Sequence, residues 1–245
     1  MELCCFHPVS SPITNVVFDV DGVLYPNSCG FEWVNVVDRI ATSTQKYVEA
    51  DTGERLTFEA AKKLSHEYYL RYGTAQKGLQ ELHGVCPDEY LAFVYDPEAL
   101  PYHTLPQCAS TFAFLQDLKA LGYGVFALTN GSTAHGQQVI ESVGLAQFFD
   151  GVRGIDANNF VPKPDPNAFI NAFNAFGVAP ENVLYIEDSL RHLTAARNFL
   201  NVGYTVHIDE QAEGPPRHSN IVDLWANTLS DAANYLRMRW LRPQM

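Results

Sequence analysis

The first pattern in the sequence that could do chemistry is a pair of carboxylates, Asp19 and Asp21, directly after the apolar residues 16–18. Residues two apart on a strand point to the same side, so both carboxylates are expected on one side of the strand's carboxyl end. Ligands of open α/β sheets bind at this edge. Two adjacent carboxylates repel each other, and Mg²⁺, a hard cation that prefers oxygen ligands, would relieve the repulsion. An ordinary Asp-Gly turn is the alternative explanation.

Two later segments carry groups suited to an anion. Thr129 and Asn130 follow the apolar residues 125–128 and precede a glycine, so a hydroxyl and backbone N–H groups could cradle a phosphate there. Lys163 stands between two prolines, which stiffen the backbone on either side of it. A helix N-cap at Thr129 and a solvated surface lysine are the competing explanations.

A second acidic pair, Glu187-Asp188, ends the apolar residues 183–186. Neighbours in an extended strand point to opposite sides, so one carboxylate can face a metal while the other supports it from behind. A helix N-cap at Asp188 or Ser189 is the alternative. Four successive segments all place such groups at strand ends. The alternative explanations, one for each segment, would therefore all have to hold at once. The sequence therefore predicts one shared site.

The elements that must position these groups alternate between strand and helix. Strands are expected at 15–20, 123–129, 151–154, 182–186 and 203–207, with helices at 108–121, 136–143, 167–176 and 190–200. Residues 219–240 are expected to be mostly helical. This alternation predicts an α/β fold, a Rossmann-like three-layer sandwich around a parallel sheet.

The connection between the first two strands far exceeds the roughly 10–12 residues that a crossover needs. Helices are expected within it at 31–50, from Thr57 to Gly73, at 75–82 and at 87–95. We therefore predict a helical cap domain at 27–105, called the inserted segment below. It interrupts a catalytic core formed by residues 1–26 and 106–245, of which 1–14 are a loose lead-in.

The composition of the chain argues against some classes of binding partner. The formal net charge of -12 argues against binding to nucleic acid. No apolar run is long enough to predict a membrane span, and the first residues do not resemble a signal peptide. The five cysteines lack metal-ligand spacing, so free thiols and a cytoplasmic location are expected. The chain is expected to be a monomer or a homodimer.

The motifs D-x-D-G-V-L, T-N, K-P and E-D-S, in this order and with a helical insert after the first, resemble the haloacid dehalogenase (HAD) superfamily. Within it they resemble the phosphatases with a C1-type helical cap. The resemblance covers residues 14–26 and 106–208 and the position of the cap. Residues 69–79 and the opening Asp-Val-Asp-x-x-Leu-Tyr are similar to pyrimidine 5′-nucleotidase-like members.

The resemblance implies a catalytic role for each aspartate of the first motif. Asp19 would attack phosphorus and form an aspartyl-phosphate, which divides one difficult displacement into two easier ones. Asp21 would protonate the leaving oxygen and then activate the water that cleaves the intermediate. A dehalogenase would not need the second aspartate, because a halide leaves without a proton.

The same resemblance implies the cofactor and the ligand contacts. Mg²⁺ would be held by Asp19, the backbone carbonyl of Asp21 and Asp188, with Glu187 supporting them. The phosphoryl oxygens would be held by Thr129, the backbone N–H of Asn130 and Lys163. Many members have a further aspartate where this chain has His192, which puts the metal surroundings in question.

A small phosphorylated metabolite is the expected substrate, with nucleoside 5′-monophosphates suggested by the subfamily resemblance. Tyr72 and Lys77 of the inserted segment are candidate substrate contacts through stacking and charge. Packing inside the segment is the alternative for its tyrosines. Two other functions stay open, a sugar-phosphate phosphomutase of the same fold and a non-catalytic HAD-like binding protein.

Overall fold

The computed structural model describes residues 12–211 and 220–239, which fold around one sheet of six parallel strands. Their order across the sheet is β3-β2-β1-β4-β5-β6. The bounds are Asn15–Phe18 (β1), Gly124–Leu128 (β2), Gly151–Arg153 (β3), Val183–Glu187 (β4), Tyr204–Ile208 (β5) and Leu224–Ala226 (β6). Strands β4 and β5 are buried along their whole length, as parallel strands covered on both faces should be.

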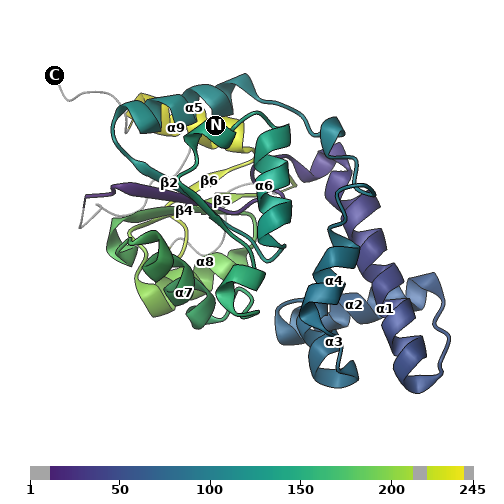
Figure 1. Cartoon of the computed structure of the whole chain (residues 1–245). Coiled ribbons are helices and arrows are strands. Elements are labelled where there is room, and N and C mark those ends of the chain that lie inside the picture. Colours follow the sequence, from purple (N-terminus) through teal and green to yellow (C-terminus); the bar gives the residue numbers. More distant parts are fainter. Residues whose placement is uncertain (1–11, 212–219, 240–245) are drawn as a thin grey trace.

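Helices cover both faces of this sheet (Figure 1). One face carries α5 (Ala109–Ala120) and α9 (Leu229–Arg239), and the other carries α7 (Pro166–Phe176) and α8 (Leu190–Leu200). The side chains of β1 alternate accordingly, because Val16 and Phe18 join the apolar cluster that includes α5, and Val17 joins the one that includes α7. The predicted three-layer α/β sandwich is confirmed.

The inserted segment forms a group of helices to one side of the sheet (Figure 1). Its helices are α1 (Val37–Thr52), α2 (Phe58–Tyr72), α3 (Ala75–His83) and α4 (Pro87–Val94). Short helical turns, η1 (Asn27–Cys29), η2 (Glu32–Val36) and η3 (Tyr102–Thr104), lie in the two connections to the core. The side chain of Thr57 caps the start of α2, and Gly73 in a left-handed conformation ends it, as the sequence predicts.

The corner between α2 and α3 approaches the core closely. A Cβ atom at Gly73 would lie 3.0 Å from Pro162 Cγ and 3.2 Å from the carbonyl oxygen of Lys163. Gly73 also has a φ of 91°, which disfavours any other residue. The absence of a side chain at this position therefore lets the inserted segment rest on the loop that carries Lys163.

Two sequence expectations differ from the structure. The segment 219–240 is not mostly helical, because β6 precedes α9; Ser219 and Trp240 themselves lie outside the described residues. A three-residue strand is too short to show a periodicity, so the pattern could not separate it from the helix. The first strand ends at Phe18 and not at Val20, although the Asp19 N–H still donates to the Ile186 carbonyl at 2.8 Å.

Residues 1–11, most of the predicted lead-in, lie outside the described part of the chain, as do residues 212–219 and 240–245. Within the described ranges, none of the helices combines the length and apolar character that crossing a membrane requires. Cys29, Cys86 and Cys108 are exposed free thiols.

Candidate active site

The acidic motifs meet because β1 and β4 are neighbours in the sheet. Phe18 is paired with Ile186, so Asp19 and Glu187 follow side by side at the carboxyl ends of the two strands. The sheet order changes direction here, with β2 and β3 on one side of β1 and β4 to β6 on the other. Open α/β sheets bind ligands at such a switch point.

Lys163 lies between these two carboxylates, although it comes from a loop outside the sheet. Its Nζ is 2.9 Å from Asp19 Oδ1 and 2.8 Å from Glu187 Oε2, and its side chain is 1% exposed. It also donates to the carbonyl of Leu128 at 3.0 Å. Burial would lower the pKa of Lys163, but the two carboxylates outweigh burial and raise it. The ammonium is therefore a permanent internal cation.

The side chain of Asn130 holds the backbone of Lys163 in place. Asn130 Nδ2 donates to the Lys163 carbonyl at 2.9 Å, and Asn130 Oδ1 accepts from the Lys163 N–H at 2.8 Å. Only an amide side chain can donate and accept in this way, so aspartate could not replace it. The T-N motif thus positions the lysine, a role that the sequence did not predict for it.

Glu187 is fully buried and pairs with Lys163. It also accepts hydrogen bonds from the hydroxyl of Tyr185 and from the N–H of Ser189. Burial would raise the pKa of Glu187, but the Lys163 ammonium outweighs burial and holds it well below the usual range. Glu187 is therefore ionised, in agreement with a supporting role behind the site.

Asp19 is the carboxylate that lacks a full counter-charge. Burial raises the pKa of Asp19 well above its ordinary value, and the negative charges of Glu187 and Asp188 raise it further, against the opposing effect of Lys163. Three carboxylates thus share one ammonium. Hard oxygen donors with surplus negative charge fit Mg²⁺, which supplies two positive charges and takes oxygen ligands.

Asp188 lies at the rim of this group. Its Oδ2 is 3.5 Å from Asn27 Nδ2, and it would be 2.3 Å from a Cβ atom at Gly22. Its backbone carbonyl lies 2.9 Å from His207 Nε2. The glycine at position 22, with a φ of 75°, therefore lets the turn after β1 come close to the Asp188 carboxylate. This brings the two predicted metal-binding segments together.

His192 contributes a nitrogen to the same region. Donor atoms of Asp19, Glu187 and His192 all lie within 4.8 Å of one another. His192 Nδ1 is 3.1 Å from Glu187 Oε2, though not in the geometry of a hydrogen bond. Lys163 already contacts both carboxylates of this group, so a cation between Glu187 and His192 would lie close to the ammonium.

Asp21 belongs to a separate group of side chains. Its Oδ1 accepts from the hydroxyl of Tyr25 at 2.5 Å and lies 2.8 Å from His135 Nε2, and its Oδ2 accepts from Thr129 Oγ1 at 3.3 Å. Burial would raise the pKa of Asp21, but His135 and the two hydroxyls outweigh it and lower the pKa from its ordinary value. Thr129, predicted to hold phosphate, here supports Asp21.

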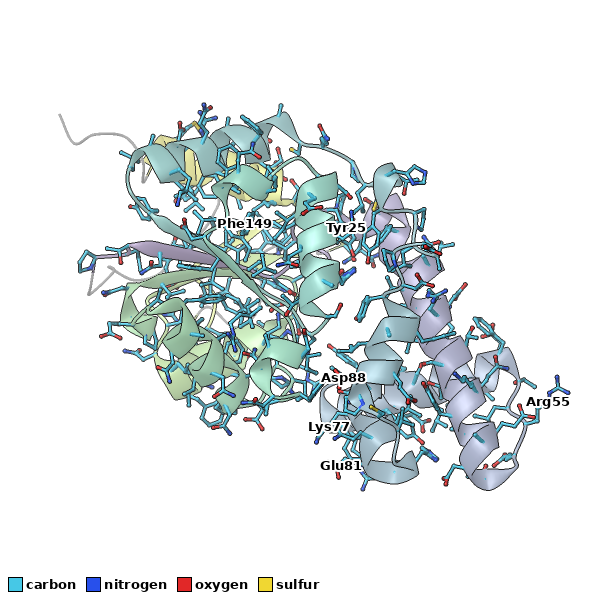
Figure 2. The ribbon with its side chains drawn as sticks, viewed as in Figure 1. Tyr25, Arg55, Lys77, Glu81, Asp88 and Phe149 are labelled. Atoms are coloured by element: carbon cyan, nitrogen blue, oxygen red, sulfur yellow. The ribbon has the colours of Figure 1, made fainter. Side chains whose placement is uncertain are left out.

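The two predicted substrate residues make their contacts within the inserted segment. Tyr72 packs edge-on against Tyr68, with ring centroids 6.2 Å apart. Lys77 pairs with Glu81 at 2.8 Å, one turn further along α3 (Figure 2). Among the described contacts, neither side chain touches the Asp19 group.

Tyr69, which the sequence analysis did not single out, does reach the core. The guanidinium of Arg191 lies 5.3 Å from the centre of its ring. Burial raises the pKa of Tyr69, against a lowering hydrogen bond with Ser189. Tyr69 therefore meets the segment that follows Glu187-Asp188.

Two further residues beside these carboxylates were not predicted from the sequence. Tyr185 stands two residues before Glu187, and strand alternation could have placed both on one side of β4. His135 lies inside α6 (Thr133–Ser142), and no local signal connects it with Asp21.

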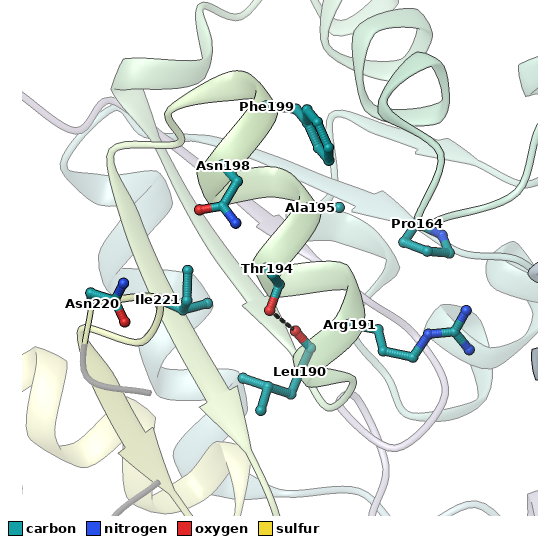
Figure 3. A pocket seen from close by; sticks show the side chains of 9 residues that line it. All are labelled: Pro164, Leu190, Arg191, Thr194, Ala195, Asn198, Phe199, Asn220 and Ile221. Carbon is teal, nitrogen blue, oxygen red and sulfur yellow. Dashed lines mark hydrogen bonds between the residues drawn. The ribbon is translucent and has the colours of Figure 1, made fainter. Parts of the chain in front are cut away.

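A surface cavity of about 690 Å³ lies along α8 (Figure 3). It is bounded by α8 together with Pro164 and residues 220–221, and Arg191 and Phe199 line it. None of the predicted site residues lines it.

Comparison with known proteins points to one family. The family described as haloacid dehalogenase-like hydrolase matches residues 13–199. A glyceraldehyde 3-phosphate phosphatase from Methanopyrus kandleri is 27% identical over 180 residues, which are 73% of this chain and 76% of that protein. An (S)-2-haloacid dehalogenase from Xanthobacter autotrophicus is 26% identical over 208 residues, which are 82% of this chain and 78% of that protein.

Comparison with solved structures shows a similar fold. The crystal structure of a HAD phosphatase from Thermococcus onnurineus superposes with a TM-score of 0.60 and 20% sequence identity, over 91% of this chain and 98% of that one. At this identity the likeness concerns the fold alone.

Proposed function

The chain belongs to the haloacid dehalogenase-like hydrolases, as its motifs predict, and we propose that it is a phosphatase that hydrolyses a small phosphomonoester through an aspartyl-phosphate on Asp19. The observation that carries the proposal is the presence of two aspartates with different surroundings at one strand end. Asp19 lies against Lys163, and Asp21 lies among hydrogen-bond donors. A halide leaves without a proton, whereas an alkoxide needs one, so a second carboxyl group supports phosphatase chemistry.

Asp19 is the nucleophile in this proposal. Its carboxylate oxygen forms a bond to phosphorus as the bond to the ester oxygen breaks, and the phosphoryl group moves to the enzyme. Lys163 holds Asp19 Oδ1 at 2.9 Å, which fixes the carboxylate and provides a positive charge for the phosphoryl oxygens. The N–H of Asn130 and the Thr129 hydroxyl remain the proposed further phosphate contacts.

Asp21 is the acid and base. It delivers a proton to the departing ester oxygen and then removes one from the water that hydrolyses the aspartyl-phosphate. Its carboxylate therefore has to move between the hydrogen bonds of this structure and the reacting oxygen. The cycle ends with Asp19 free and inorganic phosphate released.

We propose Mg²⁺ as the cofactor, held by Asp19, the backbone carbonyl of Asp21 and Asp188, with Glu187 behind them. The surplus negative charge around Asp19 supports this choice. When bound, the ion would neutralise charge between the substrate phosphate and the carboxylates.

We propose that residues 27–105 act as a cap over the site. The contact of Gly73 with the Lys163 loop and that of Tyr69 with Arg191 support this arrangement. Nucleoside 5′-monophosphates are the proposed substrates, with Tyr72 and Lys77 as contacts that depend on a different cap position from the one described. The free thiols support a cytoplasmic location.

Phosphate release from a panel of phosphomonoesters tests the proposal. Pyrimidine and purine monophosphates, sugar phosphates and p-nitrophenyl phosphate would be compared with Mg²⁺ and after chelation by EDTA. We expect release that depends on Mg²⁺ and is restored when the ion is added back. No release from any ester would favour the non-catalytic alternative, and strong release after chelation would contradict the metal assignment.

A further inference from the structure

The side chain of His135 joins Asp21 to residues that are distant in the chain, in the connection between α4 and the core. It is 1% exposed, and its Nε2 lies 2.8 Å from Asp21 Oδ1. The start of α6 fixes its backbone, since the N–H of His135 donates to Ser132 Oγ at 3.0 Å. A Cβ atom at Gly131 would lie 2.8 Å from the imidazole ring, so the turn before α6 also makes room for it.

The other nitrogen of the ring is engaged as well. His135 Nδ1 lies 2.8 Å from the hydroxyl of Tyr102, and the ring of Tyr95 packs against the imidazole with centroids 4.4 Å apart. Nε2 can donate to the Asp21 carboxylate, and Nδ1 can form a hydrogen bond with the Tyr102 hydroxyl, which can donate or accept. Tyr95 and Tyr102 both belong to the returning connection between α4 and the core.

The outgoing connection reaches the same point. Tyr25 donates its hydroxyl to Asp21 Oδ1 at 2.5 Å and stands where the core meets the inserted segment (Figure 2). Its ring packs edge-on against Phe31 at 5.5 Å, and Phe31 in turn contacts Tyr102 at 5.3 Å between ring centroids. Both connections to the inserted segment therefore touch each other and, through hydroxyl and imidazole groups, the second aspartate.

We propose that His135 is a positioning residue for Asp21, and that the chain Tyr102–His135–Asp21 ties the orientation of this carboxylate to the placement of the inserted segment. The inference rests on the proposed phosphatase function. Movement of the segment displaces Tyr25 and releases its hydroxyl from Oδ1, while His135, fixed at the start of α6, keeps the carboxylate directed toward the leaving oxygen. Return of the segment restores the hydrogen bonds of this structure.

The test compares two substrates that differ only in their leaving group, p-nitrophenyl phosphate and phenyl phosphate. A nitrophenolate leaves easily, whereas a phenolate leaves with more help from a proton, so a misplaced acid harms the second ester more. The variants are His135→Leu, which removes both nitrogens, and His135→Gln, which keeps a donor near the Nε2 position. His103→Gln is the matched control, because His103 is exposed on η3.

For His135→Leu we expect kcat/KM for phenyl phosphate to fall at least about tenfold more than for p-nitrophenyl phosphate, with KM little changed. His135→Gln should recover most of the loss, and His103→Gln should match the wild type. Tyr102→Phe, a smaller change that keeps the ring, should show the same dependence on the leaving group to a lesser degree.

Equal losses on both esters in properly folded His135→Leu, or a change confined to KM, would overturn the inference. If His135→Leu unfolds, as judged by circular dichroism, Tyr102→Phe decides by the same criterion. Failure of the proposed function has a different signature, because the wild-type protein would then release no phosphate from either ester.

Discussion

Asp19 and Asp21 are two residues apart and chemically identical, yet the fold surrounds them differently. Asp19 sits in a dense ionic group with Lys163 and Glu187, built by two neighbouring strands and one loop. Asp21 contacts His135 of α6, the Tyr25 hydroxyl at the outgoing connection and the Thr129 hydroxyl directly after β2. The first environment is built by strand ends and the Lys163 loop, whereas the second includes Tyr25 and, through His135, Tyr102.

The two environments move the pKa values in opposite directions. Burial and the neighbouring carboxylates raise the pKa of Asp19, whereas at Asp21 the effect of burial is outweighed by His135 and two hydroxyls, which lower the pKa. A nucleophile should be ionised and a general acid protonated, so the side chains alone set the reverse order. A divalent cation beside Asp19 would favour its ionised form, and release of the Tyr25 hydroxyl would favour the protonated form of Asp21.

Replacing the nucleophile should have the largest effect. Asp19→Asn removes the attacking oxygen, and we expect phosphate release to fall at least about 10⁴-fold. The fold should persist, because Lys163 keeps its contact with Glu187. Phosphate release and thermal unfolding measure the two effects. Asp88→Asn on α4 is the matched control, since this aspartate is exposed (Figure 2). Wild-type turnover in Asp19→Asn would refute the assignment.

Replacing the acid should have a smaller effect that depends on the substrate. For Asp21→Asn we expect kcat/KM for phenyl phosphate to fall about 10²–10⁴-fold, and that for p-nitrophenyl phosphate distinctly less. Asp19→Asn should show no such dependence, because bond formation to the enzyme itself is lost. Steady-state kinetics with both esters measure the difference. The same loss on the two esters would mean that the two aspartates do not divide the work as proposed.

The smallest effects are expected from variants that remove a single hydroxyl group, one beside Glu187 and one beside Asp21. Tyr185→Phe deletes a buried donor to Glu187, and we expect the free energy of unfolding to fall by about 1 kcal/mol. Tyr25→Phe, the matched change beside Asp21, should instead alter the preference between the two esters. Urea unfolding and steady-state kinetics measure the pair. If Tyr185→Phe also changed the preference between the two esters, the groups around Asp19 and Asp21 would not have separate effects on the reaction.

Much of the fold follows from local patterns in the chain. Each long strand is an apolar run bounded by turn residues, and the polar groups at strand ends converge because parallel strands end at one edge. This reasoning brings Asp19, Lys163 and Glu187 into one site. It also predicts the four helices of the inserted segment, and for α2 Thr57 and Gly73 mark the two ends.

The partners of Asp21 could not be found in this way. His135 and Tyr102 lie far from Asp21 in the chain, and neither stands at a motif position. Their contact depends on how α6 packs against the connection between α4 and the core, and no periodicity in the sequence indicates that packing. The strand β6 was missed because it has only three residues. Lys163 was expected to face phosphate alone, and its full set of carboxylate and carbonyl partners required the tertiary structure.

The missing side chain at Gly73 sets how closely the helical segment can approach the core. A methyl group there would meet Pro162 and the Lys163 carbonyl. Any substitution at this position would therefore act as a spacer that holds the corner between α2 and α3 away from the Lys163 loop, without altering any reacting group.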